Sequence, residues 1–205
     1  MEKAERATGK WKFPRLRIDP PAAVVLLCLL FAERATTGLS LLLTAAVHEA
    51  GHIAAARVLR VPLGELRVGL LGARIEARGL LSYGSEWLLA AAGPFASFLF
   101  AALTVPLRRI PFFAALCATS FLLGALNLLP VGTFDGGRML FCPLARLFGT
   151  RTAGAVLKGC SFAVLFLLWC GSVYLLLRAG GGVSWLVFSV GLLGGAFSEK
   201  QDADF

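Results

Sequence analysis

Long apolar runs with few charged side chains dominate this chain and limit the folds it can adopt. A helix that crosses a bilayer needs about 20 mostly apolar residues. Six candidate runs lie at residues 18–32, 36–58, 85–107, 111–130, 155–177 and 183–198, of which the first and last are short. The chain is 58% hydrophobic and 16% charged, whereas soluble domains usually carry about 25% charged residues. The sequence therefore predicts an all-α polytopic membrane protein with six transmembrane helices.

The basic residues are divided unequally between the two sides that these helices would create. With the N-terminus inside, 16 of the 20 Lys and Arg residues fall on the inner side and four on the outer side. Basic residues near helix ends are retained in the cytoplasm. This bias predicts a multi-pass cell-membrane protein with both termini cytoplasmic. Topology and contact with the lipid bilayer then explain the net charge of +8, and no nucleic-acid partner is expected.

The segment between the second and third predicted helices is too polar to cross a membrane. Around Leu71-Gly72 its apolar and polar residues alternate, which is typical of β-strands. We predict a small membrane-associated β-hairpin over Leu66–Arg78 with one unpaired edge. Residues 1–198 form one predicted domain with its core at about residues 38–140, and residues 199–205 form a short polar tail.

The second predicted helix contains His48-Glu49-Ala50-Gly51-His52. Residues four apart lie on one face of a helix, so His48 and His52 can bind a single metal ion. A catalytic zinc ion takes three protein ligands and keeps a position for water, whose proton Glu49 is placed to accept. The alternative is two isolated histidines satisfied by hydrogen bonds between helices. That alternative leaves a glutamate deep in the membrane unexplained.

Asp135 is the predicted third ligand, because most other acidic residues fall in the tails, in the hairpin or on the outer side. We expect it to end the fourth predicted helix, which Pro130 and the following glycines interrupt, freeing backbone that can line a polar cavity. The second and fourth helices run in the same direction. His48, His52 and Asp135 can therefore meet near the cytosolic side and hold one Zn²⁺ per chain. A simple helix-terminating aspartate is the alternative.

These motifs resemble those of the site-2 protease family of intramembrane zinc metalloproteases. The resemblance covers about residues 38–140 and rests on the histidine motif, on Ala92-Gly93-Pro94, and on Asn127-x2-Pro130-x4-Asp135-Gly136. It implies three zinc ligands (His48, His52, Asp135), a catalytic base (Glu49) and substrate-binding residues (Asn127, Pro130, Gly136). The six-helix plan most resembles the stage IV sporulation protein F type, whose members cleave a membrane-tethered pro-sigma factor. Regulatory membrane proteins would be further partners.

Two positions depart from the usual pattern of that family. Ser97 stands where an asparagine often follows the Gly-Pro pair, and residues 131–134 lack the second proline that many members carry. We expect neither position to touch a proposed zinc ligand.

Other classes of membrane protein fit the sequence less well. An aspartyl protease needs two facing aspartates, but Asp135 is the only aspartate in the predicted helical core, and no GxSG motif of a rhomboid-type protease accompanies the histidines. A zinc-binding membrane transporter or an inactive scaffold stays open as the alternative. Transporters usually carry several ionisable residues along a path or an internal repeat, whereas this chain has one compact cluster.

Overall fold

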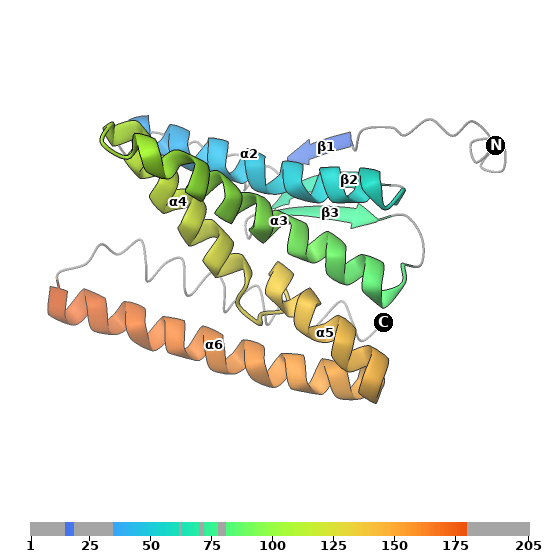
Figure 1. Cartoon of the computed structure of the whole chain (residues 1–205). Coiled ribbons are helices and arrows are strands. Elements are labelled where there is room, and N and C mark those ends of the chain that lie inside the picture. Colours follow the sequence, from blue (N-terminus) through green and yellow to red (C-terminus); the bar gives the residue numbers. More distant parts are fainter. Residues whose placement is uncertain (1–14, 19–34, 62, 70–71, 78–80, 180–205) are drawn as a thin grey trace.

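The computed structural model describes residues 15–18, 35–61, 63–69, 72–77 and 81–179, and in this part the chain is mostly helical (Figure 1). The helices are α2 (Ala35–Val58), α3 (Tyr83–Thr104), α4 (Pro111–Asn127), α5 (Asp135–Phe148) and α6 (Thr150–Ala179), with a 3-10 turn η2 (Val105–Leu107) after α3. The membrane helices predicted at 18–32 and 183–198, and the tail predicted at 199–205, lie outside the described residues.

Three described segments are long and apolar enough to cross a membrane. They are Thr36–Val58, Tyr83–Leu107 and Thr150–Tyr174, and α4 is a shorter apolar helix. All four coincide with predicted spans. Large apolar side chains on their outer faces, such as Phe95, Leu103 and Phe121, are more than half exposed in the isolated chain. Such faces are typical of helices that contact lipid.

One face of α2 is buried and largely polar. Every fourth residue on this face is buried: Ser40, Thr44, His48, His52 and Ala56. The hydroxyl of Thr44 shares hydrogen bonds with the hydroxyls of Thr119 (3.0 Å) and Ser120 (3.1 Å) in α4. In lipid, the hydrophobic effect does not drive apolar helices together. Such hydrogen bonds and close packing therefore hold α2 against its neighbours.

The helices α2 and α3 approach each other closely at Gly51. A β-carbon at this position would lie 2.6 Å from the carbonyl oxygen of Ala92 and 2.7 Å from the β-carbon of Ala96, both in α3. Real β-carbons essentially never come so close to other heavy atoms. Residue 51 must therefore be glycine if the two helices are to keep this separation, and the histidines on either side of it face α3.

Three strands form a small sheet in the order β1-β2-β3: β1 (Arg15–Ile18), β2 (Leu63–Gly69) and β3 (Gly72–Ala77). The strands β2 and β3 pair antiparallel in the segment where the sequence predicts a hairpin. The strand β1 pairs parallel with β2, which the sequence analysis did not predict. Because β2 is interior, β3 is the hairpin strand that forms an edge of the described sheet.

The chain after α4 differs from the prediction. The fourth helix ends at Asn127, and Asp135 is instead the first residue of a separate helix, α5. Pro130 has no amide hydrogen and disfavours a helical conformation in the residue before it, so residues 128–134 form a turn. The helix α5 was not predicted, because its 14 residues are too few and too charged to read as a membrane span.

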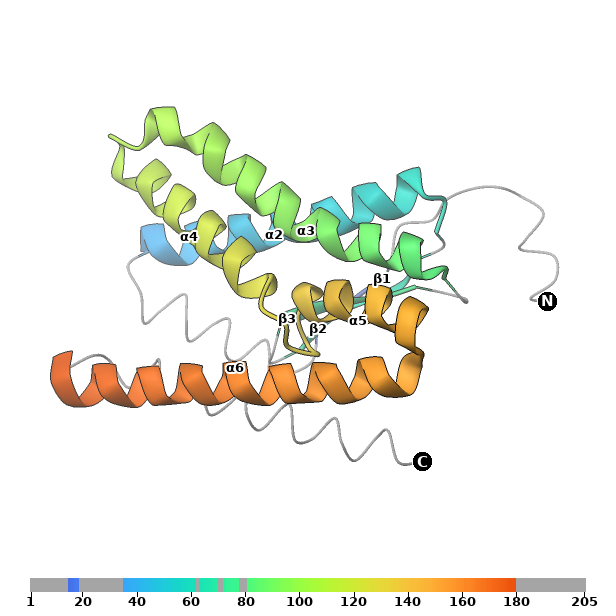
Figure 2. The same ribbon diagram turned by 60° about the horizontal axis from the view of Figure 1, so that its bottom comes forward.

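The helix α5 lies between α3 and α6 (Figures 1 and 2). Val131 and Phe134 of the preceding turn form a buried cluster with Leu165 of α6. The hydroxyl oxygen of Ser161 in α6 accepts a hydrogen bond from the amide of Gly132 at 3.0 Å. The turn that leads into Asp135 is thereby fixed against α6.

Candidate metal centre

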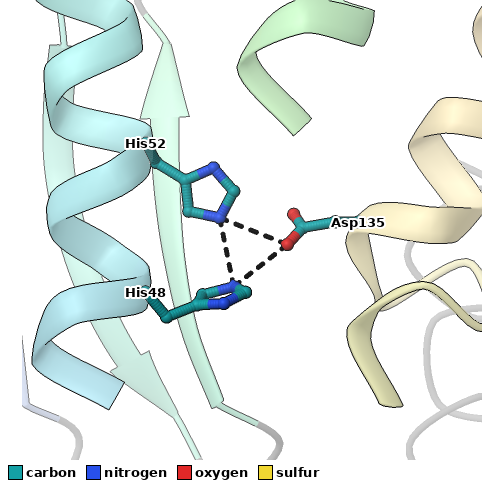
Figure 3. Close-up of side chains that lie close together, drawn as sticks. All are labelled: His48, His52 and Asp135. Carbon is teal, nitrogen blue, oxygen red and sulfur yellow. Dashed lines mark hydrogen bonds and ion pairs between the residues drawn. The ribbon is translucent and has the colours of Figure 1, made fainter. Parts of the chain in front are cut away.

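Three buried side chains from α2 and α5 point toward one another (Figure 3). The Nε2 atoms of His48 and His52 lie 3.1 and 3.2 Å from Oδ2 of Asp135, and 3.3 Å from each other. The structure thus brings together the three residues that the sequence predicts as zinc ligands. Asp135 reaches them from the start of α5 rather than from the end of the fourth helix.

The dimensions of this triangle fit a zinc ion. Zinc binds imidazole nitrogen and carboxylate oxygen at about 2.0–2.2 Å, so two corners of its coordination tetrahedron are roughly 3.3–3.5 Å apart. The three observed separations between donor atoms, from 3.1 to 3.3 Å, are at or just below this range. The three atoms can therefore occupy three corners of one tetrahedron with only a small adjustment, which leaves the fourth corner for another ligand.

Hydrogen bonds between neutral rings do not account for the triangle. Nδ1 of His52 lies 2.8 Å from the carbonyl oxygen of Leu89, which can only accept, so Nδ1 carries the hydrogen. In a neutral ring, Nε2 of His52 then turns a lone pair toward the carboxylate of Asp135. Such an arrangement needs positive charge between the groups, supplied by a proton on the ring or by a bound cation, because buried polar atoms are almost always paired. A cation that suits imidazole and carboxylate together, such as Zn²⁺, satisfies all three groups at once.

The helix α3 supports both histidines from behind. Nδ1 of His52 donates to the carbonyl oxygen of Leu89, and Nδ1 of His48 lies 2.9 Å from the hydroxyl oxygen of Ser97. The expectation that Ser97 touches no proposed ligand was therefore wrong. Leu89, Gly93 and Ser97 are spaced four apart, so they share the face of α3 that meets the histidines. This spacing from the Gly-Pro pair is the signal that could have identified Ser97.

Gly93 lies directly against the two imidazole rings. A β-carbon at this position would overlap the His52 ring and would lie 2.7 Å from Nε2 of His48. The space beside the Nε2 atoms is therefore open only because residue 93 has no side chain. Gly93 belongs to the Ala92-Gly93-Pro94 motif, and its closeness to the two rings gives this motif a steric reason.

Two further glycines, which follow Asp135, let the first turn of α5 pack closely on the turn before it. A β-carbon at Gly136 would overlap the carbonyl oxygen of Leu128, and one at Gly137 would overlap the carbonyl oxygen of Val131. The first turn of α5 therefore packs directly on backbone. The predicted contact of Gly136 with substrate stays a prediction, and this packing is an independent reason for a glycine there.

The other two residues that were predicted to bind substrate lie near the turn. The side-chain amide of Asn127 donates to the carbonyl oxygen of Leu123 at 3.0 Å, within α4. The carbonyl oxygen of Pro130 accepts a hydrogen bond from Ser161 at 3.4 Å. Both residues are partly buried, and neither belongs to the triangle. Their roles in substrate binding stay predictions.

Glu49 follows the first histidine and is partly buried beside the cluster. Its carboxylate interacts electrostatically with His52 and Asp135 but is not one of the three converging groups. Burial raises the pKa of Asp135, whereas the two adjacent histidines lower it, and the net pKa is below its usual range. A lowered pKa favours the carboxylate form of Asp135, which is the form that binds a cation.

An ion pair also links α3 to α5 near the cluster. A guanidinium nitrogen of Arg138 lies 3.5 Å from a carboxylate oxygen of Glu86, and both side chains are about one third exposed. Exposed pairs of this kind contribute at most about 1 kcal/mol. The close glycine packing is therefore the stronger constraint on where α5 and Asp135 lie.

Part of the chain matches a known peptidase family, and the fold resembles that of one solved protease. Residues 103–171 match Peptidase family M50. This stretch contains Asp135 but not the histidine motif. The fold is similar to that of the Site-2 Protease from Methanocaldococcus jannaschii, with a TM-score of 0.69 over 93% of each chain and 19% sequence identity. No curated protein sequence matches the chain.

Proposed function

We propose that this chain is an intramembrane zinc metalloprotease of the site-2 protease type. It hydrolyses a peptide bond in or near the transmembrane segment of a membrane-tethered protein. The observation that carries this proposal is the buried triangle of two Nε2 atoms and one Oδ2 atom beside Glu49, set among long apolar helices. The partial match to Peptidase family M50 and the similar fold of an archaeal Site-2 Protease support it.

Each residue of the cluster has a separate task in this proposal. His48, His52 and Asp135 hold one zinc ion, which when bound polarises the scissile carbonyl group and makes water a better nucleophile. Glu49 accepts a proton from the attacking water and later passes it to the leaving amine. Glu49 can do so because it lies beside the three ligands without being one of them.

The substrate must present an extended backbone, because the peptide bonds of a helix in lipid are hydrogen-bonded within that helix. We assign β3 (Gly72–Ala77) as the strand on which the unwound substrate adds by β-augmentation. In the described sheet β1 and β3 are the edge strands, and β1 already covers the outer side of β2. The free side of the predicted hairpin is therefore the outer edge of β3.

The remaining assignments follow from the sequence. The apolar runs predict six crossings, the charge bias predicts both termini in the cytosol, and the direction of the helices then predicts the metal centre toward the cytosolic side. The resemblance to the stage IV sporulation protein F type rests on this six-helix plan, and it implies a membrane-tethered pro-sigma factor as substrate. Cleavage of such a factor on co-expression, compared with other single-span proteins, tests this assignment.

Replacing Glu49 by Gln separates a protease from a zinc-binding transporter or scaffold. The purified variant should keep one zinc per chain, but cleavage of a co-expressed single-span substrate should fall by at least about 100-fold, as for loss of a general base. Glu86→Gln is the matched control, because Glu86 pairs with Arg138 and does not belong to the cluster. Full cleavage by the Glu49→Gln variant would show that Glu49 is not the base. A wild-type chain without stoichiometric zinc would refute the whole proposal.

A further inference from the structure

The two histidines of the cluster have different partners behind them. Nδ1 of His52 faces the carbonyl oxygen of Leu89 at 2.8 Å, and a carbonyl oxygen can only accept a hydrogen bond. Nδ1 of His48 faces the hydroxyl of Ser97 at 2.9 Å, and a hydroxyl can either donate or accept. The tautomer of His52 is therefore fixed, whereas that of His48 is not.

The position of Ser97 is determined from several sides. Its side chain is fully buried, with 0% of its surface exposed. It lies on α3 one helical turn after Gly93, and it faces His48 of α2 in front. Behind it, α4 packs so tightly that a β-carbon at Gly124 would lie 3.2 Å from the β-carbon of Ser97. The hydroxyl is therefore confined to the neighbourhood of the His48 ring.

We propose that Ser97 is a positioning residue for His48, whose hydroxyl reverses its hydrogen bond when the metal binds. This proposal rests on the zinc site described above. Without metal, the Ser97 hydroxyl donates to Nδ1, and the Nε2 hydrogen of His48 is donated to Asp135, 3.1 Å away. With metal, Nε2 offers its lone pair, Nδ1 carries the hydrogen, and Ser97 accepts it. The net change moves one proton from Nε2 to Nδ1 by way of water, and the ring stays neutral.

This arrangement keeps the Ser97 hydroxyl and Nδ1 of His48 hydrogen-bonded to each other in both states. Carbonyl groups behind both histidines would fix both rings with lone pairs toward Asp135, which is unfavourable until a cation arrives. The Ser97 hydroxyl behind His48 lets that ring donate a hydrogen bond to the carboxylate of Asp135 before a metal ion binds. Contacts to the second nitrogen of a metal-binding histidine typically change metal affinity by about 10- to 100-fold when they are removed.

The test compares Ser97→Ala with Ser120→Ala in the full chain, purified in detergent with an affinity tag that contains no histidine. Ser120 is also a fully buried serine, but its hydroxyl contacts Thr44 and not the histidines. Competition with a chromophoric chelator should show zinc affinity falling about 10- to 100-fold in Ser97→Ala. The Ser120→Ala variant should bind zinc like the wild type.

The tautomers can be observed directly, because the chain has only two histidines. Nitrogen-15 NMR of histidine-labelled wild type should show, without zinc, one ring protonated at Nε2 and one at Nδ1. With zinc, both rings should be protonated at Nδ1. In the zinc-free Ser97→Ala variant, the signals of the His48 ring should shift while those of the His52 ring stay in place.

The outcomes distinguish this inference from the proposed function. Equal zinc affinity in wild type and Ser97→Ala, or an equal loss in Ser97→Ala and Ser120→Ala, overturns the role of Ser97 and leaves the zinc site standing. Two Nδ1-protonated rings in the zinc-free wild type overturn the reversal of the hydrogen bond. A wild-type chain that binds no zinc overturns the proposed function itself.

Discussion

Replacing Gly93 by Ala places a methyl group where the metal centre requires open space. The new β-carbon would lie 2.7 Å from Nε2 of His48 and 2.5 Å from Cε1 of His52, whereas real β-carbons essentially never come within 3.0 Å of such atoms. The rings must therefore move by about half an ångström or more, which reaches the tolerance of roughly 0.5 Å for a functional site. We expect that the Nε2 atoms of the two histidines no longer converge on Oδ2 of Asp135.

For Gly93→Ala, we expect a large loss of zinc affinity but only a small loss in the free energy of unfolding of the metal-free chain. Removing a contact behind a metal ligand reduces affinity by about 10- to 100-fold, and displacing the ligands themselves should exceed about 100-fold. Alanine is favoured over glycine in a helix by about 1 kcal/mol. This gain partly offsets the steric strain, so the metal-free variant should still fold.

The assay is zinc binding by competition with a chelator, together with thermal unfolding of the metal-free chain in detergent. The control is Gly84→Ala, also in α3, where a β-carbon would meet nothing within 4 Å. This control should bind zinc like the wild type and be slightly more stable. If Gly93→Ala binds zinc with wild-type affinity, the Nε2 atoms do not converge beside Gly93, and the assignment of the metal centre is wrong.

Two further changes test the seat of Asp135 and the substrate strand. Gly137→Ala forces a β-carbon onto the carbonyl oxygen of Val131, so thermal unfolding should show that the free energy of unfolding falls by about 1–3 kcal/mol. The control Gly132→Ala places its β-carbon in open space and should not lower this free energy. Equal stability of the two variants would refute this packing. In an antiparallel strand alternate amides point toward the partner and away from it, so prolines at 73 and 75 test one direction of β3 and proline at 74 the other. The set that points away should abolish cleavage without changing zinc content or stability, and full cleavage with both sets would exclude β3 as the docking strand.

The long apolar helices could be predicted from the sequence because their signal is local. Runs of apolar residues at 36–58, 85–107, 111–130 and 155–177 coincide with α2, α3, α4 and α6. The strand β1 has only four residues, and its partner β2 follows in the sequence only after the whole of α2. No local pattern therefore indicates β1. The helix α5 depends on contacts with α3 and α6, and no local pattern of apolar residues predicts those contacts.

The site could be predicted in part for the same reason. The spacing of His48 and His52 is a property of any helix, and the direction of the helices brings Asp135 to the same depth. The support from Leu89 and Ser97 depends on how α3 is rotated about its axis. That rotation is set where Gly51 lets α2 press on the backbone of Ala92. A contact of this kind between two helices is not visible in either helix alone.

The role of α3 implies that the proposed metal binding and helix packing are coupled in this molecule. The face of α3 that carries Leu89, Gly93 and Ser97 orients both histidines and limits the space beside them. Any movement of α3 against α2 therefore changes the separation of the Nε2 atoms. By linkage, an ion that binds only the packed arrangement stabilises that arrangement. Zinc bound by His48, His52 and Asp135 should thus act as a further contact between α2 and α5, in addition to its proposed role in the reaction.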